Sequence, residues 1–237
     1  MLTIKNFSKS YQKEKKACDN ISLTIEDGDL FGFIGPNGAG KSTTIKSIVG
    51  ILDFEEGDIL LDDLSIKEHP MECKKMVAYI PDNPDIYPHL TGTKYLNFLG
   101  EVFDVPSNIL KERIINYSTK FELHDHLNEP IHSYSHGMKQ KLAFIGAFIH
   151  EPKLMILDEP FVGLDPKSTY TLKETMKEYV LKGNSIFFSS HVLEVVEKLC
   201  NKVAIIKDGK IVCAGPIDII RGDESLESMF LEITDHE

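Results

Sequence analysis

Hydrophobic and polar residues alternate through much of residues 2–34, as they do in strands that have one face in a core. The pattern is clearest where Ile21, Leu23 and Ile25 alternate with polar residues. The continuous apolar run at 30–34 is instead typical of a short strand buried on both faces. We therefore expect an N-terminal antiparallel β layer that leads into a buried strand.

The remaining chain shows strand patterns on both sides of a helical stretch. Residues 57–62 and 76–80 are typical of strands, whereas apolar residues recur at helical spacing from 91 to 121 and the helical character continues to about 149. We therefore expect one domain, 1–237, with a helical subdomain at about 91–149 inserted into a core at about 1–90 and 150–237. The later core elements expected are a strand at 153–160, a helix at 166–181, a strand at 185–190, a hairpin of 203–206 with 210–214, and a short polar tail.

Length and composition narrow the class of protein. A chain of 237 residues suffices for one large domain, and its net charge of −11 argues against DNA or RNA as a partner. The four cysteines form no C-x-x-C pair, so we expect reduced thiols in the cytosol. The sequence begins without a signal-peptide pattern, and its longest apolar run, at 142–149, is too short to cross a bilayer. A membrane function would therefore depend on a partner.

A glycine-rich stretch at 35–43 follows the buried strand and precedes a predicted helix that ends at Gly50. It has the pattern G-x-x-x-x-G-K-[ST], in which glycines let backbone N–H groups turn toward a phosphate. Lys41 would reach the β- and γ-phosphates, and the Ser42 hydroxyl would bind Mg²⁺. The alternative, a chance glycine turn, does not account for the flanking strand and helix. The expected nucleotide-binding residues are Gly35, Pro36, Asn37, Gly38, Ala39, Gly40, Lys41, Ser42 and Thr43.

Three side chains with acid–base or metal-binding chemistry follow predicted strands. Asp158 and Glu159 end the strand at 153–160, and in a parallel sheet that end lies beside the phosphate loop. Asp158 is then a candidate metal ligand and Glu159 a candidate general base. His191 follows the next strand and could contact the γ-phosphate; a helix cap or surface residue is the alternative. These motifs predict an α/β fold, a P-loop NTPase core with a mainly parallel sheet, the N-terminal antiparallel layer and the helical insertion.

A third motif precedes the carboxylate strand. Residues 134–142, Tyr-Ser-His-Gly-Met-Lys-Gln-Lys-Leu, stand where the ATP-binding subunits of ABC transporters carry their Leu-Ser-Gly-Gly-Gln signature, and the chain resembles that family over nearly its whole length. The resemblance implies that two such domains sandwich two ATP molecules. Taken alone, Tyr11 is better explained as a half-buried strand residue. The resemblance implies that Ser135, His136 and Gly137 face the partner's ATP, that Tyr11 stacks on adenine, that Asp165 contacts the partner domain and that His191 is the switch histidine.

The chain departs from the common family pattern at three places. The signature has Tyr134, His136 and Met138 instead of Leu, Gly and Gln. Asp82 replaces the usual metal-contacting glutamine, and because a carboxylate still offers oxygen to Mg²⁺ we count it with Ser42 and Asp158 as a metal ligand. Lys94 stands where a glutamate is frequent, which would alter contact with a partner.

The loop at 82–90 joins the predicted core to the helical stretch. It displays Ile86, Tyr87 and Leu90, apolar groups that an exposed loop has little reason to carry. The family resemblance favours a groove here that receives a short helix of the membrane subunit. The alternative is that the three side chains pack under the helical subdomain.

The resemblance implies a function for the whole chain. It implies an ATPase that uses ATP and Mg²⁺, forms a homo- or heterodimer of ATP-binding domains, and drives a separate transmembrane permease from the cytoplasmic face of the membrane. The Ser-x-Gly-Met-Lys-Gln signature and the short tail look most like bacterial exporter-type systems. Two alternatives stay open: a soluble ABC-type ATPase acting in assembly or regulation without a membrane partner, and a regulatory subunit with weak ATPase activity.

Overall fold

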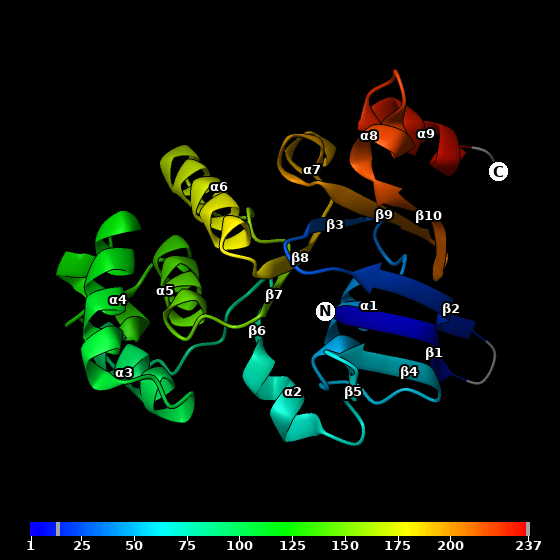
Figure 1. Cartoon of the computed structure of the whole chain (residues 1–237). Helices are drawn as coiled ribbons and strands as arrows, with labels where there is room; N and C mark the ends of the chain where they lie inside the picture. Colours follow the sequence, from blue (N-terminus) through cyan, green and yellow to red (C-terminus); the bar gives the residue numbers. More distant parts are fainter. Residues whose placement is uncertain (13–14, 236–237) are drawn as a thin grey trace.

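The computed structural model describes residues 1–12 and 15–235, which form two β-sheets with helices between and around them (Figure 1). The smaller sheet is antiparallel, with strand order β2-β1-β4-β5. Buried residues stand opposite one another across its strands: Leu2 pairs with Ile25 and Leu61. The predicted N-terminal antiparallel layer is confirmed. Its strands are β1 (Leu2–Gln12), β2 (Lys15–Ile25), β4 (Glu56–Leu61) and β5 (Leu64–Ser65).

The larger sheet carries the predicted motifs. Its strand order is β10-β9-β3-β8-β7-β6, parallel except at the β9–β10 hairpin. Every residue of β3, β7 and β8 is buried, as expected of parallel strands that are covered on both faces. The carboxyl ends of β3, β8 and β7 therefore lie side by side. The strands are β3 (Leu30–Ile34), β6 (Val77–Ile80), β7 (Leu154–Asp158), β8 (Ser185–Ser190), β9 (Lys202–Lys207) and β10 (Lys210–Pro216).

Two hydrophobic cores lie on the two faces of this larger sheet, and β3 contributes to both. Phe31 and Phe33 pack into the core shared with the antiparallel sheet, whereas Leu30 and Ile34 pack into the core shared with the helices. Ile45 of α1 (Lys41–Ile48) belongs to the first core. The helix that follows the phosphate loop is therefore held between the two sheets.

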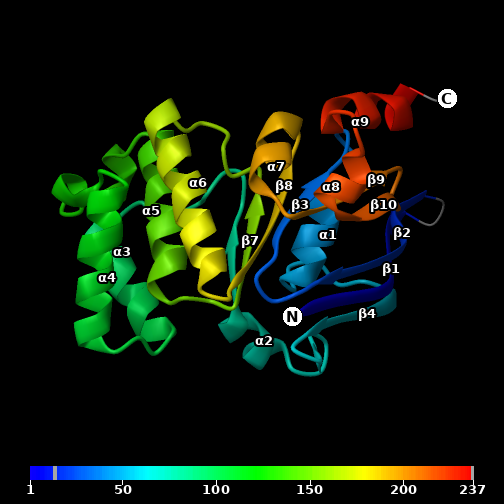
Figure 2. The same ribbon diagram turned by 45° about the horizontal axis from the view of Figure 1, so that its top comes forward.

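The helices of the inserted stretch gather at one end of the molecule, away from the antiparallel sheet (Figure 1, Figure 2). Thr91 accepts the Lys94 N–H at the start of α3, and Ser135 accepts the Met138 N–H at the start of α5. Capping by these hydroxyls fixes where both helices begin. The elements are α3 (Gly92–Val102), α4 (Ser107–Lys120), α5 (His136–Ile149) and the short 3₁₀ helices η1 (His124–His126) and η2 (Ile131–Ser133).

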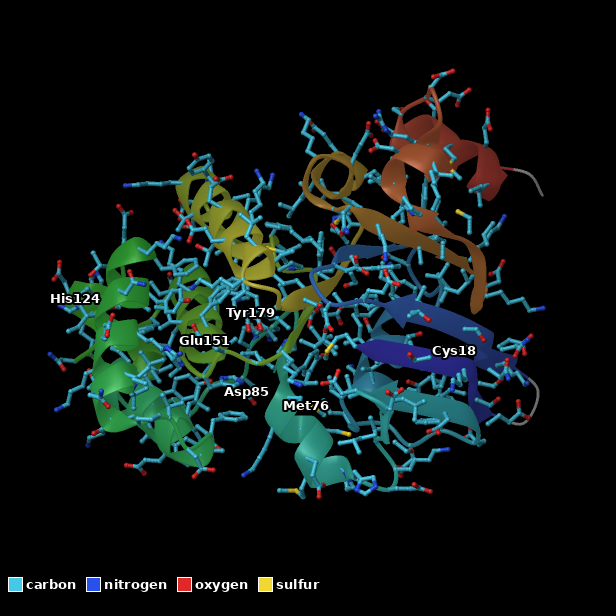
Figure 3. All side chains as sticks on the ribbon, in the orientation of Figure 1. Cys18, Met76, Asp85, His124, Glu151 and Tyr179 are labelled. Carbon is cyan, nitrogen blue, oxygen red and sulfur yellow. The ribbon has the colours of Figure 1, made fainter. Side chains whose placement is uncertain are left out.

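Other helices surround the core, and two expectations prove wrong there. Met76 ends α2 (Pro70–Met76) instead of opening a strand, so β6 begins at Val77 (Figure 3). The expected polar tail contains α8 (Ile217–Arg221) and α9 (Leu226–Asp235), because Leu226 is fully buried and its N–H is bound by the Glu197 carboxylate of α7 (Leu193–Leu199). The helix α6 (Pro166–Leu181) has the predicted bounds. In the part of the chain that the structure describes, none of the helices has both the length and the apolar composition needed to cross a bilayer.

Candidate nucleotide site

The chain between β3 and α1 curls around a cavity of about 580 Å³. Two glycines permit this path. A Cβ atom on Gly35 would lie 2.3 Å from the Ile206 carbonyl oxygen, and one on Gly40, which has a φ of 110°, would lie 2.6 Å from that of Ala17. Larger residues would clash with backbone at both places. The loop thus delivers the N-terminal end of α1, which favours negative charge, to the cavity.

Lys41 is the cation of this loop and is only 7% exposed. Its Nζ donates hydrogen bonds to the Gly35 carbonyl at 2.6 Å and the Pro36 carbonyl at 3.2 Å. Burial lowers the pKa of Lys41, and the charges of Glu159 and Asp158 oppose that shift. The ammonium group of Lys41 therefore lies where it can be attracted by the carboxylates of Asp158 and Glu159 and by a phosphate bound in the loop. Of the predicted phosphate-loop residues, Asn37, Gly38, Gly40, Lys41, Ser42 and Thr43 line the cavity, whereas Gly35, Pro36 and Ala39 do not.

Tyr11, from β1, lies on the rim of the same cavity. Its Oη is 3.2 Å from Thr43 Oγ1, and its side chain is 60% exposed. That exposure rules out the half-buried interpretation of this residue. A flat aromatic face beside a phosphate loop can stack on a base. Lys16, Ala17, Asp208 and Gly209 also line this side, and the sequence analysis missed them because each lies far from the motif.

Asp158 and Glu159 reach the cavity from the end of β7. Asp158 is 5% exposed, and its Oδ1 accepts the Ser189 hydroxyl at 2.5 Å. The same Ser189 oxygen accepts the Glu159 N–H at 3.1 Å. Ser189 therefore fixes both acids from the neighbouring strand β8. Sequence reasoning missed it, because the position of Ser189 opposite Asp158 depends on the register of the sheet.

Glu159 lines the cavity, whereas His191 does not line it and reaches the site through its contact with the Glu159 carboxylate. Glu159 Oε2 lies 2.9 Å from His191 Nδ1 and also accepts the His191 N–H at 3.3 Å. The backbone of Glu159 has a φ of 49°, in the left-handed region that non-glycine residues seldom adopt. This bend directs the carboxylate of Glu159 toward the end of β8. Strain of this kind is common where a side chain must be aimed for chemistry.

The oxygen atoms around the cavity suit a hard cation. Ser42, Asp82 and Asp158 contribute a hydroxyl and two carboxylates, and Asp82 Oδ1 also accepts the Asn83 N–H at 2.9 Å. Among the described residues, no group of three or more His, Cys, Asp or Glu side chains is arranged to hold a metal alone. Mg²⁺ needs no such group, because it is usually bound by one or two carboxylates together with phosphates and water. The donor set therefore fits Mg²⁺ bound together with a nucleotide.

The predicted signature residues lie on a different surface of the chain from this cavity. His136 packs against Gly163, since a Cβ atom on that glycine would lie 2.6 Å from His136 Cδ2. Asp165 caps α6, and hydrogen bonds from Ser168 lower its pKa to about 2. Lys141 Nζ lies 3.6 Å from the Asp165 carboxylate. The structure thus groups Ser135, His136 and Gly137 with the segment 163–165, and not with the phosphate loop of the same chain.

Comparison with known proteins shows in which family similar sequences and structures occur. The sequence model of the family described as "ABC transporter" matches residues 18–162. The ABC transporter ATP-binding protein NatA of Bacillus subtilis is 31% identical over 97% of this chain and 95% of its own length. An uncharacterised ABC transporter ATP-binding protein of Nostoc sp. is 36% identical over a match that covers 86% of this chain and 61% of the length of that relative. A solved ATP-binding subunit of an ABC transporter has a TM-score of 0.95 at 32% identity and covers 99% of both chains.

The predicted fold class is confirmed by this likeness. The family match covers the phosphate loop and the carboxylate strand, which line the cavity, and the signature segment, which lies on a different surface of the chain. We conclude that the chain belongs to the ABC transporter family, among its ATP-binding subunits.

Proposed function

We propose that this chain is an ATP-hydrolysing subunit that powers transport, in the export direction, by a separate transmembrane partner. The observation that carries the proposal is the convergence of the phosphate loop, Asp158 and Glu159 on one cavity, with His191 bonded to the Glu159 carboxylate. A general base within reach of a phosphate loop is the arrangement that nucleotide hydrolysis requires. The exporter-type signature motif supports the direction.

The residues at this site have different roles in the proposed hydrolysis. Glu159 accepts the proton of the attacking water, and His191 holds that carboxylate and can contact the γ-phosphate. Lys41 neutralises phosphate charge, and Tyr11 stacks on the base. Mg²⁺, held by Ser42, Asp158 and Asp82, supplies additional charge neutralisation when bound.

A second copy of an ATP-binding domain completes the proposed site. Ser135 and Gly137 stand at the N-terminal end of α5, where a hydroxyl, backbone N–H groups and the helix dipole favour an anion. Because this surface lies outside the chain's own cavity, it would bind the nucleotide held by the partner domain. We propose that Asp165 contacts the partner domain beside it. Hydrolysis would then reopen the dimer and change the conformation of the permease.

The loop at 82–90 is our proposed contact with that permease. Ile86 is buried in the core and Leu90 packs against it, so the packing explanation holds for these two residues. Tyr87 is 58% exposed and forms an edge-to-face pair with Phe98 of α3, the ring centroids being 5.9 Å apart. Beside this loop, a cavity of about 260 Å³ separates β6 from α3 and α5. An exposed aromatic pair next to a cavity suits an apolar helix of a partner.

Tyr87→Ala should weaken co-purification with the membrane partner by about tenfold or more, because an aromatic side chain that becomes buried at the centre of an interface contributes about 2 kcal/mol or more. Basal ATPase activity of the isolated subunit should stay near normal. Pull-down from detergent-solubilised membranes, with mass spectrometry, measures the first and phosphate release the second. Tyr170→Ala removes a tyrosine of α6 that is 67% exposed, slightly more than Tyr87, and serves as the control.

Asp82→Ala should behave differently, since Asp82 lines the nucleotide cavity. The turnover of this variant should depend less strongly on Mg²⁺, and its transport activity should also fall.

Normal partner recovery with Tyr87→Ala would refute the docking site. Recovery of only proteins without transmembrane spans would favour the alternative of a soluble ATPase.

His150 predicts a pH dependence of stability. It lies at the end of α5, stacks on Phe103 with the ring centroids 3.8 Å apart, and its Nδ1 is 3.1 Å from the Gly146 carbonyl oxygen. Burial lowers the pKa of His150 to about 4. Between pH 6.5 and 4 the unfolded chain therefore binds a proton that the folded chain excludes, and stability falls as the pH falls.

The free energy of unfolding should drop by about 2 kcal/mol through this residue between pH 7.5 and 5. His150→Phe keeps an aromatic ring and should lack this component. Urea unfolding of both proteins at the two pH values measures it. An equal pH dependence in the two proteins would contradict the assignment.

A further inference from the structure

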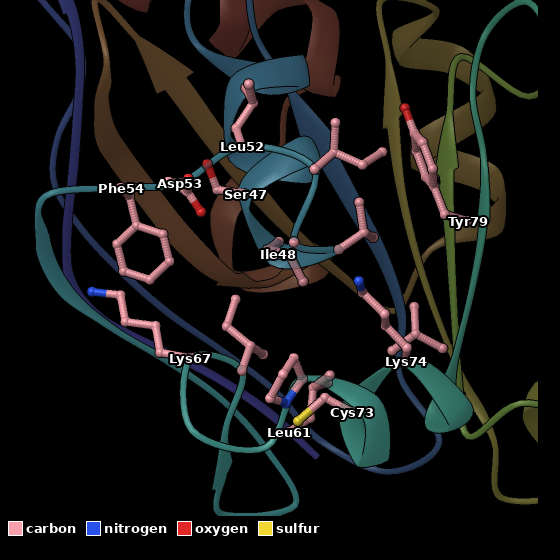
Figure 4. A pocket seen from close by; sticks show the side chains of 16 residues that line it. Ser47, Ile48, Leu52, Asp53, Phe54, Leu61, Lys67, Cys73, Lys74 and Tyr79 are labelled. Carbon is pink, nitrogen blue, oxygen red and sulfur yellow. The ribbon is translucent and has the colours of Figure 1, made fainter.

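A second large cavity, of about 590 Å³, lies beyond the C-terminal end of α1 and is separate from the nucleotide cavity (Figure 4). Residues from the end of α1 line one side, and Leu61 and Cys73 line the opposite side. Phe54 and Lys67 stand at one flank, with Tyr79 and Lys74 at the other. The lining is mainly apolar and comes from α1, the loop after it, β4, residues 66–67 after β5, α2 and β6. Neither the motifs nor the proposed chemistry explains it.

The sequence builds this cavity through the way α1 ends. Gly50 has a φ of 69°, its N–H binds the Ser47 carbonyl at 3.1 Å, and the Ile51 N–H binds the Lys46 carbonyl at 2.8 Å. This pair of bonds is a Schellman turn, which glycine allows. The turn stops the helix and carries residues 51–54 around the rim. The turn therefore determines one rim of the cavity.

Two hydroxyl groups beside the cavity lack hydrogen-bond partners. Ser47 is fully buried, and Ser47 Oγ and Tyr79 Oη bond to none of the described residues. Both residues line the cavity, from α1 and from β6. A buried hydroxyl without a partner costs free energy, so natural structures seldom keep one without a reason. Both oxygen atoms are shielded from the open space of the cavity, and Figure 4 shows the Tyr79 hydroxyl pointing away from it. A bound molecule with a polar atom could therefore become a partner of Ser47 Oγ after rotation of that one side chain, but not of Tyr79 Oη.

The charges at the mouth are predominantly positive. The aliphatic part of Lys74 lies over the end of α1, because a Cβ atom on Gly50 would be 3.8 Å from Lys74 Cε. Among the described residues, the Lys74 amine has no ion pair or hydrogen bond. Lys67 holds its amine 3.8 Å from the centroid of the Phe54 ring. Against these two cations, Asp53 is the acid among the lining residues.

We propose that this cavity binds an amphipathic organic anion, with an apolar body among the aliphatic side chains and an acidic group at Lys74. A largely apolar pocket with a few convergent polar groups is the usual form of a small-molecule site. Its volume equals that of about twenty water molecules at about 30 Å³ each, enough for a fused aromatic sulfonate or a twelve-carbon carboxylate. The proposal concerns the isolated chain and does not depend on hydrolysis or on a permease.

The test is a fluorescence titration of the full chain with 1-anilinonaphthalene-8-sulfonate, followed by displacement with dodecanoate. We expect saturable binding at one site per chain and full displacement. Lys74→Glu should weaken binding about tenfold or more, because it reverses the charge at the mouth. Lys75→Glu is the matched control, since Lys75 is the next residue of α2, pairs with Asp104 and does not line the cavity.

Ser47→Ala gives an independent readout. It should weaken binding about two- to tenfold, because it removes one hydrogen bond to the ligand, while the Tm of the ligand-free protein stays equal or rises. Absence of saturable binding would overturn the proposal, and so would equal effects of Lys74→Glu and Lys75→Glu. The former result is also the one expected if the cavity receives a segment of a partner protein. Either failure would leave the ATPase assignment intact, since no nucleotide enters the assay.

Discussion

Glu159→Gln should leave ATP affinity unchanged and reduce steady-state turnover about 10²–10⁴-fold. The amide retains the shape of the side chain but cannot take a proton from the attacking water. Ser189 would still hold the backbone of residue 159, so the site keeps its geometry. Phosphate release and calorimetric ATP binding measure the two quantities. Because hydrolysis is what reopens the proposed dimer, light scattering should show this variant accumulating as a dimer with ATP.

Glu122→Gln is a matched control for this experiment. Glu122 also has a left-handed backbone, with a φ of 54°, and neither it nor its partner Lys167 lines the cavity. Its turnover should equal that of the unmodified protein. Normal turnover of Glu159→Gln would exclude the general-base role, and a monomer at saturating ATP would count against the two-domain sandwich.

Lys41→Ala should weaken ATP binding about 10- to 150-fold for each charge-assisted hydrogen bond to phosphate that it removes, since such a bond contributes about 1.5–3 kcal/mol. The substitution deletes the buried cation that lies inside the phosphate loop. It also deletes the hydrogen bonds to Gly35 and Pro36, so circular dichroism must show that the fold survives. Titration calorimetry with ATP and Mg²⁺ measures the affinity.

Lys46→Ala provides the comparison for Lys41. Lys46 stands five residues later on the same helix and does not line the cavity. Its removal tests whether general loss of positive charge explains the effect. Unchanged ATP affinity in Lys41→Ala, or equal losses in the two variants, would remove Lys41 from the phosphate site.

Much of the fold could be predicted because its strongest signals are local. Parallel strands buried on both faces give continuous apolar runs, and the phosphate loop fixes a strand and a helix on either side of itself. Parallel pairing then brings the ends of β7 and β8 beside that loop, so Asp158, Glu159 and His191 could be grouped without coordinates. The closing hairpin followed from Asp208 and Gly209.

The features that the sequence analysis missed are short helices and contacts between neighbouring strands. The helices α7 and α8 have seven and five residues, too few for a period of 3.6 to stand out. The helix α9 did carry Leu226, Met229, Phe230 and Ile233 at helical spacing, but the polar residues around them masked it. Ser189 acts only through its position opposite Asp158 in the sheet, and that register is not visible along the chain.

The left-handed backbone at Glu159 means that folding and turnover make opposite demands on one position. A side chain in this region costs about 1–2 kcal/mol, whereas glycine occupies it freely. Selection for thermal stability alone would therefore tend to replace Glu159 by glycine. The resulting protein would be more stable but would lack the proposed proton acceptor. Engineering of this subunit for stability must therefore measure ATP turnover as well, because glycine at this position would relieve the strained backbone and also disable hydrolysis.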